Sequence, residues 1–486
     1  MTAHPSRRGF LRASLAGAST FVAYDPLLCT WIRESRAGCI PIPSLDGVLV
    51  EAGPLLAESA DDFGHIVSHA PVAVLLPGSI HDVKKLVKFA RKHGLRVGGM
   101  SMIGNTHSTQ GQSQVDAGVV IDMSAFDEIH EINPGDALVD AGVRWIELLE
   151  ATVPLGKSPP TLTDHIDLSI GGTLSVGGIG GQAFRHGLQA DNVLELQVVT
   201  GEGHVVTCSP SHHAELFDAV LAGLGQFAII VRARVRLVDV PAMTRTYTAV
   251  YADAATLTAD QVALIEDGRF DYVEGAAFPD GGGGWLFSLE AVRYFDPGDP
   301  PDDAALLSGL SFLPGTASTT DQSYFDFANR LAPLIAFLQS IGVWDLPHPW
   351  LNLMLPGSQA AAFVQGTLAG TTSTDVGEGP ILIYPFKTSK VTREFLRLPD
   401  EGIAFLFAML RNSLPPIPGH LASQLQDNRD LYDAARAIGG TNYAISSIPF
   451  GPLDWQDHFG PLWGEFVAAK DQFDPDRVLT PGQNIF

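Results

Sequence analysis

The chain has 486 residues, of which 45% are hydrophobic, so it can form one large composite unit or two domains. It carries 54 Asp and Glu residues against 30 Lys and Arg residues, a formal net charge of -24. So acidic a surface repels nucleic-acid phosphates and anionic lipids, which excludes nucleic acid as a partner. The three cysteines, Cys29, Cys39 and Cys208, show neither paired metal spacing nor a redox CxxC motif, so we expect no metal site.

The first 40 residues are predicted to be an export signal. Two adjacent arginines, Arg7 and Arg8, precede a mildly apolar segment over 13–24 that is too short to span a bilayer. This arrangement is typical of twin-arginine signals, which carry folded proteins. We expect export through the twin-arginine translocase to the periplasm or the exterior, with no membrane span. The alternative is a basic N-terminal segment without a targeting role.

Strand-like and helix-like segments alternate between residues 70 and 241. The segment over 81–93 has apolar residues at helical spacing and is followed by Gly94, a typical C-cap residue. Over 228–238, apolar residues alternate with arginines, which predicts a strand with one buried and one solvated face. The other elements expected here are strands over 72–76, 95–99 and 119–123, a hairpin over 194–208 and a helix over 214–224.

The texture of the sequence changes after Pro241. Residues 242–442 contain loops rich in Gly, Pro and Asp and mix helices with strands such as the one over 381–385, which indicates a second, α+β lobe. The last stretch, 443–486, ends without a polar tail, which favours a packed terminus. We therefore divide the chain into segments 1–40, 41–241, 242–442 and 443–486.

Two segments between residues 104 and 182 contain candidate chemistry. The first, 104–112, follows a predicted strand and contains His107, although a single loop histidine is usually a surface or hydrogen-bonding residue. The second, 164–182, contains six glycines, and glycine-rich turns let backbone N–H groups approach a diphosphate. It lacks a Walker lysine and the context of a Rossmann fingerprint, so a dinucleotide would be bound by a different fold.

Long runs of sequence resemble a known family. The runs over 171–188, 218–227, 347–352 and 481–486 are similar to the cytokinin dehydrogenases, which belong to the vanillyl-alcohol oxidase superfamily of PCMH-type flavoproteins. The resemblance covers most of the chain and implies an α+β fold. It comprises a PCMH-type FAD-binding domain of two α/β subdomains (41–241), a substrate-binding domain with a central antiparallel sheet, and a C-terminal return to the FAD domain.

The resemblance implies that FAD is bound covalently through His107. In the family, the histidine of a Gly-His-Ser motif is bonded to the flavin 8α-methyl group, and His107-Ser108 occupies that place. Such a cofactor cannot dissociate after export, and the bond raises its potential as a hydride acceptor. A second, cysteinyl link is excluded because residues 155–207 contain no cysteine. The other residues implied to contact FAD are Gly104, Thr106, Ser108, Gln112, Asp164, Ser169, Ser175, Ile179, Ile229 or Ile230, Thr480 and Gln483.

The family's catalytic base is an aspartate just before the glycine-rich segment, and Asp164 fits that place. It would accept a proton or hydrogen bond from a substrate amine as hydride moves to flavin N5. Asp167 is a rival, and without the resemblance Asp164 would be read as a turn or capping residue. Glu274, Trp350 and Asn352 resemble substrate-pocket residues, although Trp350 fits core packing equally well.

The pocket departs from the plant members at several positions. Thr106 replaces the glycine usual before the linking histidine, Leu162 replaces a tryptophan, 312–315 lacks a glutamate, and 445–447 lacks an aromatic–aliphatic pair. The leading hypothesis is removal of N6 side chains from adenine derivatives, with oxygen or a quinone as electron acceptor. The alternatives are a covalent-flavin oxidase of another amine, alcohol or sugar, and a binding protein without turnover.

Overall fold

The computed structural model describes residues 23–25, 30–32, 40–101, 106–414 and 417–486. Most of the predicted export signal over 1–40, including Arg7 and Arg8, and Gly104 lie outside these residues. Near the N-terminus, β1 (Ala23–Asp25) pairs with β2 (Thr30–Ile32) and with β3 (Ile40–Pro41).

A four-stranded sheet forms the first half of the region over 41–241. Its order is β4-β5-β7-β6, in which β7 runs parallel to β5 and β6, and β4 is antiparallel to β5. The 14-residue helix α3 ends where Gly94 takes the left-handed conformation at φ 71°, which confirms the predicted C-cap. The bounds are β4 Val48–Val50, α2 Pro54–Glu58, β5 Ala73–Leu76, α3 Ile80–His93, β6 Val97–Met100 and β7 Val119–Asp122.

A five-stranded antiparallel sheet forms the second half, in the order β12-β11-β13-β9-β8. The arginines of β13 pair with acidic residues of neighbouring strands rather than only with solvent, as in Arg232 with Asp140 and Arg234 with Asp136. The strands are β8 Ile129–Ile132, β9 Asp136–Asp140, β11 Val193–Thr200, β12 Val205–Cys208 and β13 Ala228–Arg236, and β10 Lys157–Ser158 pairs separately with β14 Val238–Asp239. The helices are α4 Trp145–Thr152, α5 Ile170–Val176, α6 Ala183–His186 and α7 Ala214–Val220.

Helix α7 is four residues shorter than the helix predicted over 214–224. Ala222 and Leu224 both take positive φ of 57°. The backbone N–H of Ala222 donates to Leu174, and that of Leu224 donates to Ser175. The turn thereby satisfies carbonyl groups near the C-terminus of α5, which have no partner inside their own helix.

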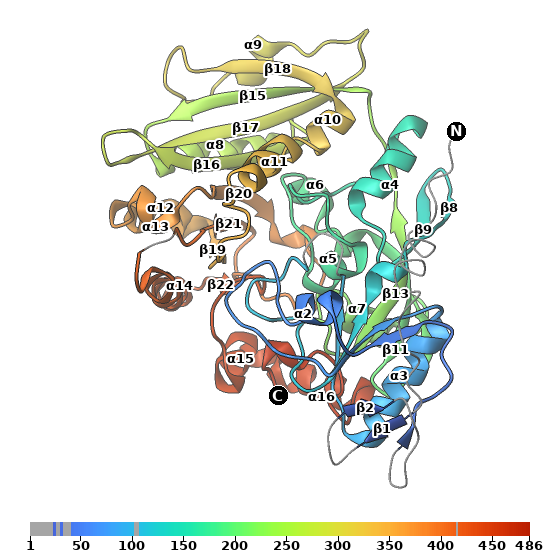
Figure 1. The fold of residues 1–486 in the computed structure, drawn as a ribbon. Coiled ribbons are helices and arrows are strands. Elements are labelled where there is room, and N and C mark those ends of the chain that lie inside the picture. The colour runs from blue at the N-terminus through green and yellow to red at the C-terminus, as the bar shows by residue number, and fades with distance from the viewer. Residues whose placement is uncertain (1–22, 26–29, 33–39, 102–105, 415–416) are drawn as a thin grey trace.

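The third sheet is antiparallel and has eight strands, in the order β18-β15-β17-β16-β20-β21-β19-β22. Helices α8 and α12 contact each other and pack on its strands, and the sheet fills the upper and left parts of Figure 1. Its strands are β15 Met243–Tyr251, β16 Tyr272–Pro279, β17 Trp285–Phe295, β18 Ser318–Ser323, β19 Leu351–Pro356, β20 Ile381–Lys387, β21 Ile403–Met409 and β22 Thr441–Asn442. The accompanying helices are α8 Ala254–Asp267, α9 Asp303–Leu307, α10 Tyr324–Ala328, α11 Ala332–Ser340, α12 Gly357–Ala369, α13 Ser373–Val376 and α14 His420–Ala437.

The C-terminal segment, with α15 (Pro452–Phe459) and α16 (Trp463–Phe473), returns to the four-stranded sheet. Val97 of β6 donates to Val478 at 2.8 Å and accepts from Thr480 at 2.9 Å. Buried Lys470 pairs with Asp474 at 2.8 Å and donates to the carbonyl of Gln226 at 2.7 Å. The last residues of the chain are therefore packed, as the sequence predicts.

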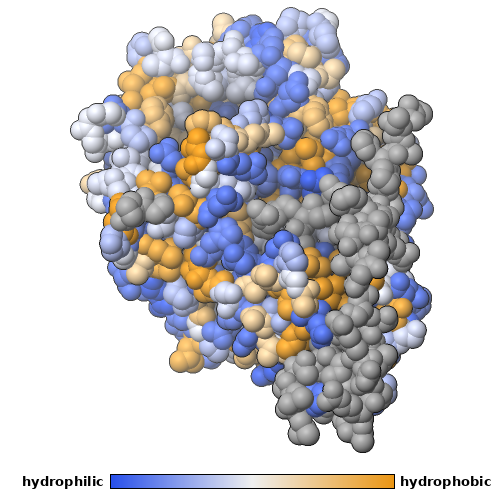
Figure 2. Space-filling model, viewed as in Figure 1, coloured by the Kyte–Doolittle hydropathy of each residue, from blue (hydrophilic) through white to orange (hydrophobic). Residues whose placement is uncertain are grey.

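The visible surface mixes hydrophilic and hydrophobic residues without one continuous apolar face (Figure 2). Within the described part of the chain, none of the helices has the length and apolar character needed to cross a bilayer.

Candidate active site

His107, which follows β6 in the sequence, lies in a stack of aromatic rings. Its ring is 3.9 Å from the ring of Phe63, centroid to centroid, and His348 stacks on Phe63 at the same distance. Trp350 meets the His107 ring edge-on at 5.3 Å. We call Phe63, His107, His348 and Trp350 the aromatic stack. It brings the predicted linking histidine against a predicted substrate residue 243 positions away in the sequence.

The loop that holds His107 is fixed by Asp62. Ser108 Oγ donates to Asp62 Oδ2 at 2.8 Å, and the N–H of Gly111 donates to the same oxygen at 2.7 Å. Burial raises the pKa of Asp62 to about 7, although these hydrogen bonds oppose the shift. Gln112, a predicted FAD contact, shapes the same loop: its Oε1 accepts the N–H groups of Thr109 and Gln110.

The electronic state of His107 suits a covalent link. Burial, assisted by His165 and His348, lowers the pKa of His107 well below its usual value, so the ring is neutral at physiological pH. Among the described residues, the buried Nδ1 atom of His107 has no hydrogen-bond partner. A neutral imidazole with a free buried nitrogen fits attachment of a flavin, because an unsatisfied buried polar atom is otherwise costly.

Two predicted substrate residues also present unsatisfied donors. Within the described part of the chain, the buried atoms Trp350 Nε1 and Asn352 Nδ2 have no hydrogen-bond partner. The backbone of Asn352 is fixed, since its N–H donates to Ser446 Oγ and its carbonyl accepts from that same hydroxyl. Two free donors on a rigid segment next to His107 are typical of a site that receives a polar ligand.

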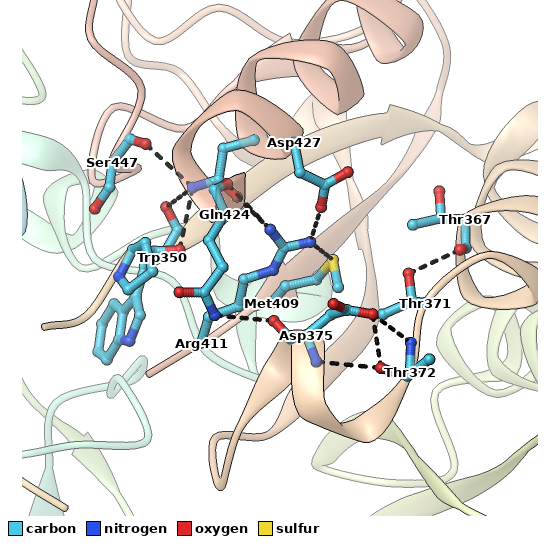
Figure 3. Close-up of polar contacts among 12 residues, drawn as sticks. Trp350, Thr367, Thr371, Thr372, Asp375, Met409, Arg411, Gln424, Asp427 and Ser447 are labelled. Atoms are coloured by element: carbon cyan, nitrogen blue, oxygen red, sulfur yellow. Dashed lines mark hydrogen bonds and ion pairs between the residues drawn. The ribbon is translucent and has the colours of Figure 1, made fainter. Parts of the chain in front are cut away.

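A buried polar network contacts the backbone carbonyl of Trp350 (Figure 3). Arg411 is fully buried and donates to Asn428 Oδ1 at 3.1 Å. Asn428 Nδ2 in turn donates to the carbonyls of Trp350 and Ser447, and Ser447 Oγ donates to the carbonyl of Thr109 in the His107 loop. The network thus connects α14, the segment that carries Trp350 and the His107 loop. The other Arg411 contacts are with Gln424, Met409 and Asp427.

Asp164 sits in a second cluster, which contains three carboxyl groups. Tyr272 Oη donates to Asp164 Oδ1 at 2.7 Å, and Arg330 Nη2 donates to that oxygen at 2.8 Å. Arg330 also reaches Glu274 at 3.3 Å and Glu290 at 3.0 Å, and Tyr272 makes a close contact with Glu274. We call these five residues the carboxylate cluster. It unites the predicted base, Asp164, with the predicted substrate residue Glu274.

The two groups of residues adjoin. His165, the neighbour of Asp164, lies 5.1 Å from the ring of His107. Burial lowers the pKa of His165, so it adds no positive charge between the clusters at neutral pH. Asp167, the rival base, instead forms an ion pair with Arg144 and is 40% exposed. The geometry therefore favours Asp164 over Asp167 as the carboxylate beside the stack.

Close packing within the chain explains why glycine is required at some positions of the glycine-rich segment. A Cβ atom at Gly181 would lie 2.5 Å from the Tyr272 ring, and one at Gly180 would overlap the Leu162 carbonyl. Ser169 is the N-cap of α5, and Ser175 Oγ donates back to the carbonyl of Gly171. These glycines let strand β16 approach the segment that carries Asp164. Contact of this segment with a diphosphate stays a prediction.

The remaining predicted FAD contacts each have their own neighbours. Ile179 is buried beside Tyr443, and Ile229 and Ile230 are both buried in β13. Thr106 Oγ1 donates to the carbonyl of Ser101, and Thr480 Oγ1 donates to that of Gly225. Gln112 and Gln483 line one cavity of about 440 Å³ together with Gln110, Asn442 and Ser446.

Sequence reasoning missed four residues that build the site. Asp62 and Phe63 hold the His107 loop, and Tyr272 and Arg330 hold Asp164. Tyr272 could have been found, because it lies two positions before Glu274 in one strand and so points to the same face. The other three belong to loops or turns whose periodicity carries no signal.

Two family models match the chain. A model described as "FAD binding domain" matches residues 71–209, and one described as "Cytokinin dehydrogenase 1, FAD and cytokinin binding" matches residues 279–486. Cytokinin dehydrogenase 8 of Oryza sativa subsp. indica is 39% identical, with 88% of this chain and 90% of that protein covered. Cytokinin dehydrogenase 2 of Arabidopsis thaliana is 34% identical, with 93% and 97% covered. An uncharacterised oxidoreductase of the fasciation locus of Rhodococcoides fascians is 38% identical, with 88% and 97% covered.

Among solved structures, 6-hydroxy-D-nicotine oxidase from Arthrobacter nicotinovorans has a similar fold. The TM-score is 0.68 at 21% identity, with 90% of this chain and 96% of that one covered. Fold and family models together define an FAD-linked oxidoreductase with a PCMH-type fold, which confirms the predicted fold class and enzyme class. Within that class, the chain belongs to the cytokinin dehydrogenase family.

Proposed function

We propose that this enzyme carries FAD covalently on His107 and oxidises the C–N bond of a secondary amine, with N6-substituted adenines as the leading substrates. The observation that carries the proposal is the meeting of three features: the free, buried Nδ1 atom of His107, the free donors of Trp350 and Asn352, and the carboxylate of Asp164. The names of the relatives support the substrate class.

The bound flavin would supply the hydride acceptor, and the protein groups would manage the substrate. Asp164 would accept the proton of the substrate N–H group as the neighbouring C–H bond breaks. Trp350 and Asn352 would orient the substrate with their free donors, and Glu274 would complete the polar wall. The imine product would then be hydrolysed by water, releasing adenine and an aldehyde from a cytokinin.

Anaerobic mixing with isopentenyladenine tests the substrate. We expect the flavin absorption to bleach, because hydride transfer reduces the isoalloxazine. Bleaching by other amines, alcohols or sugars but not by isopentenyladenine would favour the second candidate. Absence of bleaching by any of them would contradict an enzymatic role.

The second candidate, oxidation of another small molecule, is favoured by the residues at 445–447, where plant members have an aromatic–aliphatic pair in the substrate pocket. Ser446 and Ser447 are both used to tie backbone segments together, since Ser446 Oγ bonds Asn352 and Ser447 Oγ bonds Thr109. These two serines offer a substrate less apolar surface than the aromatic–aliphatic pair of the plant enzymes would. The residue differences over 445–447 therefore bear on substrate choice.

Export and the electron acceptor also belong to the proposal. We propose that the N-terminal Arg7-Arg8 segment directs the folded enzyme to the twin-arginine translocase, a route that suits a protein loaded with cofactor before export. Oxygen or a quinone would reoxidise the flavin. Loss of export on replacing Arg7 and Arg8 with lysine would support the route, and unchanged export would contradict it.

A further inference from the structure

The Tyr272 hydroxyl lies between two carboxyl groups and one guanidinium. Its oxygen is 2.7 Å from Asp164 Oδ1, is in close contact with Glu274 Oε2, and is 2.5 Å from Arg330 Nη2. Tyr272 and Glu274 are two positions apart in β16, so both side chains leave the strand on one face. The phenol therefore forms a bridge between the predicted base and the predicted substrate residue.

The hydrogen atoms available to this bridge can be counted. A phenol has one hydrogen to donate, and Arg330 can donate but cannot accept. Tyr272 can thus donate to Asp164 or to Glu274, but not to both. The remaining carboxyl group must carry a proton of its own and donate it to the phenol oxygen, or two oxygens would face each other without a hydrogen.

The surroundings decide which carboxyl group is protonated. Burial, followed by the charge of Asp164, raises the pKa of Glu274 well above its usual value, although Arg330 and the contact with Tyr272 oppose the shift. Burial also raises the pKa of Tyr272 well above its usual value, so the phenol keeps its hydrogen. The arrangement that satisfies all three groups is Glu274 donating to Tyr272, and Tyr272 donating to an ionised Asp164.

Arg330 supplies the fixed positive charge of the cluster. It leaves the turn between α10 and α11, lies 5.0 Å from the centre of the Tyr272 ring, and contacts three carboxyl groups. The titratable groups facing it come from the segment before α5 (Asp164), from β16 (Tyr272, Glu274), from β17 (Glu290, Tyr294) and from β20 (Tyr384). With one proton on Glu274, the cation faces two carboxylates.

We propose that Tyr272 and Arg330 are positioning residues that keep the resting proton of the site on Glu274 and leave Asp164 as the free carboxylate. This inference rests on the proposed role of Asp164 as the base and goes beyond it, because it assigns the protonation state of its neighbour. Glu274 then already carries one proton when Asp164 takes a proton from the substrate, so the carboxyl groups of the cluster hold two protons after that step.

Four variants test the assignment through the pH dependence of flavin reduction in the holoenzyme. Tyr272→Phe removes the donor to Asp164, so the acidic limb of the profile should move to higher pH by about one unit or more. Glu274→Gln replaces a protonated carboxyl by a neutral amide that can still donate to Tyr272, so the limb should stay in place even if the rate falls. Arg330→Lys keeps the positive charge and should move the limb less than Arg330→Met.

The contrary results are equally specific. A limb that moves to lower pH in Glu274→Gln would mean that a negative charge was removed and that Glu274 is ionised at rest. A limb unmoved in Tyr272→Phe would show that the phenol only packs. Either result overturns the assignment.

A second measurement separates this inference from the proposed function. The infrared spectrum of the substrate-free protein at neutral pH should contain a protonated carboxyl band that is lost in Glu274→Gln. This readout needs no substrate, so it remains informative if isopentenyladenine is not oxidised. Absence of the band from the wild-type protein would contradict the inference, whichever substrate the enzyme uses.

Discussion

The aromatic stack and the carboxylate cluster adjoin but solve opposite problems. The stack holds a histidine without charge, in van der Waals contact with flat rings and with one nitrogen free. The cluster holds buried Glu274 and the partly buried Asp164 and Glu290 around one cation. Burial acts on both, but it removes charge from His107 and places a proton on Glu274. The same physical effect thus lowers the pKa of the predicted attachment residue on one side and raises the pKa of a carboxyl group beside the proposed base on the other.

The largest effect should come from removing the attachment point. In His107→Ala we expect no flavin to remain with the denatured protein, because the nitrogen that forms the bond is gone. Fluorescence of the protein band on a denaturing gel measures this. His348→Ala is the matched control, since His348 stacks on the other face of the same phenylalanine and should leave the link intact. A fluorescent band in His107→Ala would contradict the prediction that His107 is the residue that binds the flavin covalently.

The next effect concerns the cluster. Asp164→Asn should slow anaerobic flavin reduction by about 10²–10⁴-fold while covalent flavin content stays unchanged, because an amide cannot take the amine proton. Asp167→Asn is the control, since its carboxylate is committed to Arg144. Equal slowing in both variants would contradict the assignment of the base.

Stability should respond to the cation of the cluster. Arg330→Met leaves the partly buried carboxylates Asp164 and Glu290 uncompensated and should lower the free energy of unfolding by about 1–3 kcal/mol at neutral pH. The loss should be smaller at pH 5 than at pH 8, because carboxyl groups with raised pKa bind protons in the folded state and are stabilised as pH falls. Arg436→Met, which breaks an exposed ion pair with Asp457, should change stability by less than about 1 kcal/mol. A loss that is independent of pH would contradict the charge argument.

The smallest expected effect concerns Asp62, which holds the loop of His107 in the aromatic stack. Asp62 has a folded-state pKa of about 7, above its ordinary value of 3.8, so its proton is favoured by folding. The penalty for ionising it grows as pH rises through that window and is complete above about pH 7. In Asp62→Asn, the fall in unfolding free energy between pH 4 and 7 should therefore be flatter than in the wild type. An unchanged slope would show that Asp62 titrates normally.

The elements with strong periodicity could be predicted from the sequence. The contacts that bring distant residues together in the candidate site could not. The 81–93 helix with Gly94, the 194–208 hairpin and the strand over 381–385 are confirmed because their apolar spacing and turn residues act locally. The end of α7 was predicted wrongly, since it depends on hydrogen bonds to α5 that lie outside the segment. His107 and Asp164 were selected through family resemblance, which carries positions but not partners.

Arg330 and Phe63 illustrate why the partners could not be found. Arg330 reaches Asp164 across 166 positions, and His348 stacks on Phe63 across 285. Such contacts follow from how the sheets are placed against each other, and no local spacing encodes them. Buried charges in particular can be recognised only when their counter-ions are known.

The most direct test of the account is the mass of one peptide. Trypsin should release residues 97–144 as a single peptide, because neither lysine nor arginine occurs between Arg96 and Arg144. We predict that this peptide from the denatured, digested enzyme carries the flavin, with fragmentation placing the added mass on His107. An unmodified 97–144 peptide, or a flavin found on any other residue, would contradict the central claim that His107 is the attachment point beside Asp164.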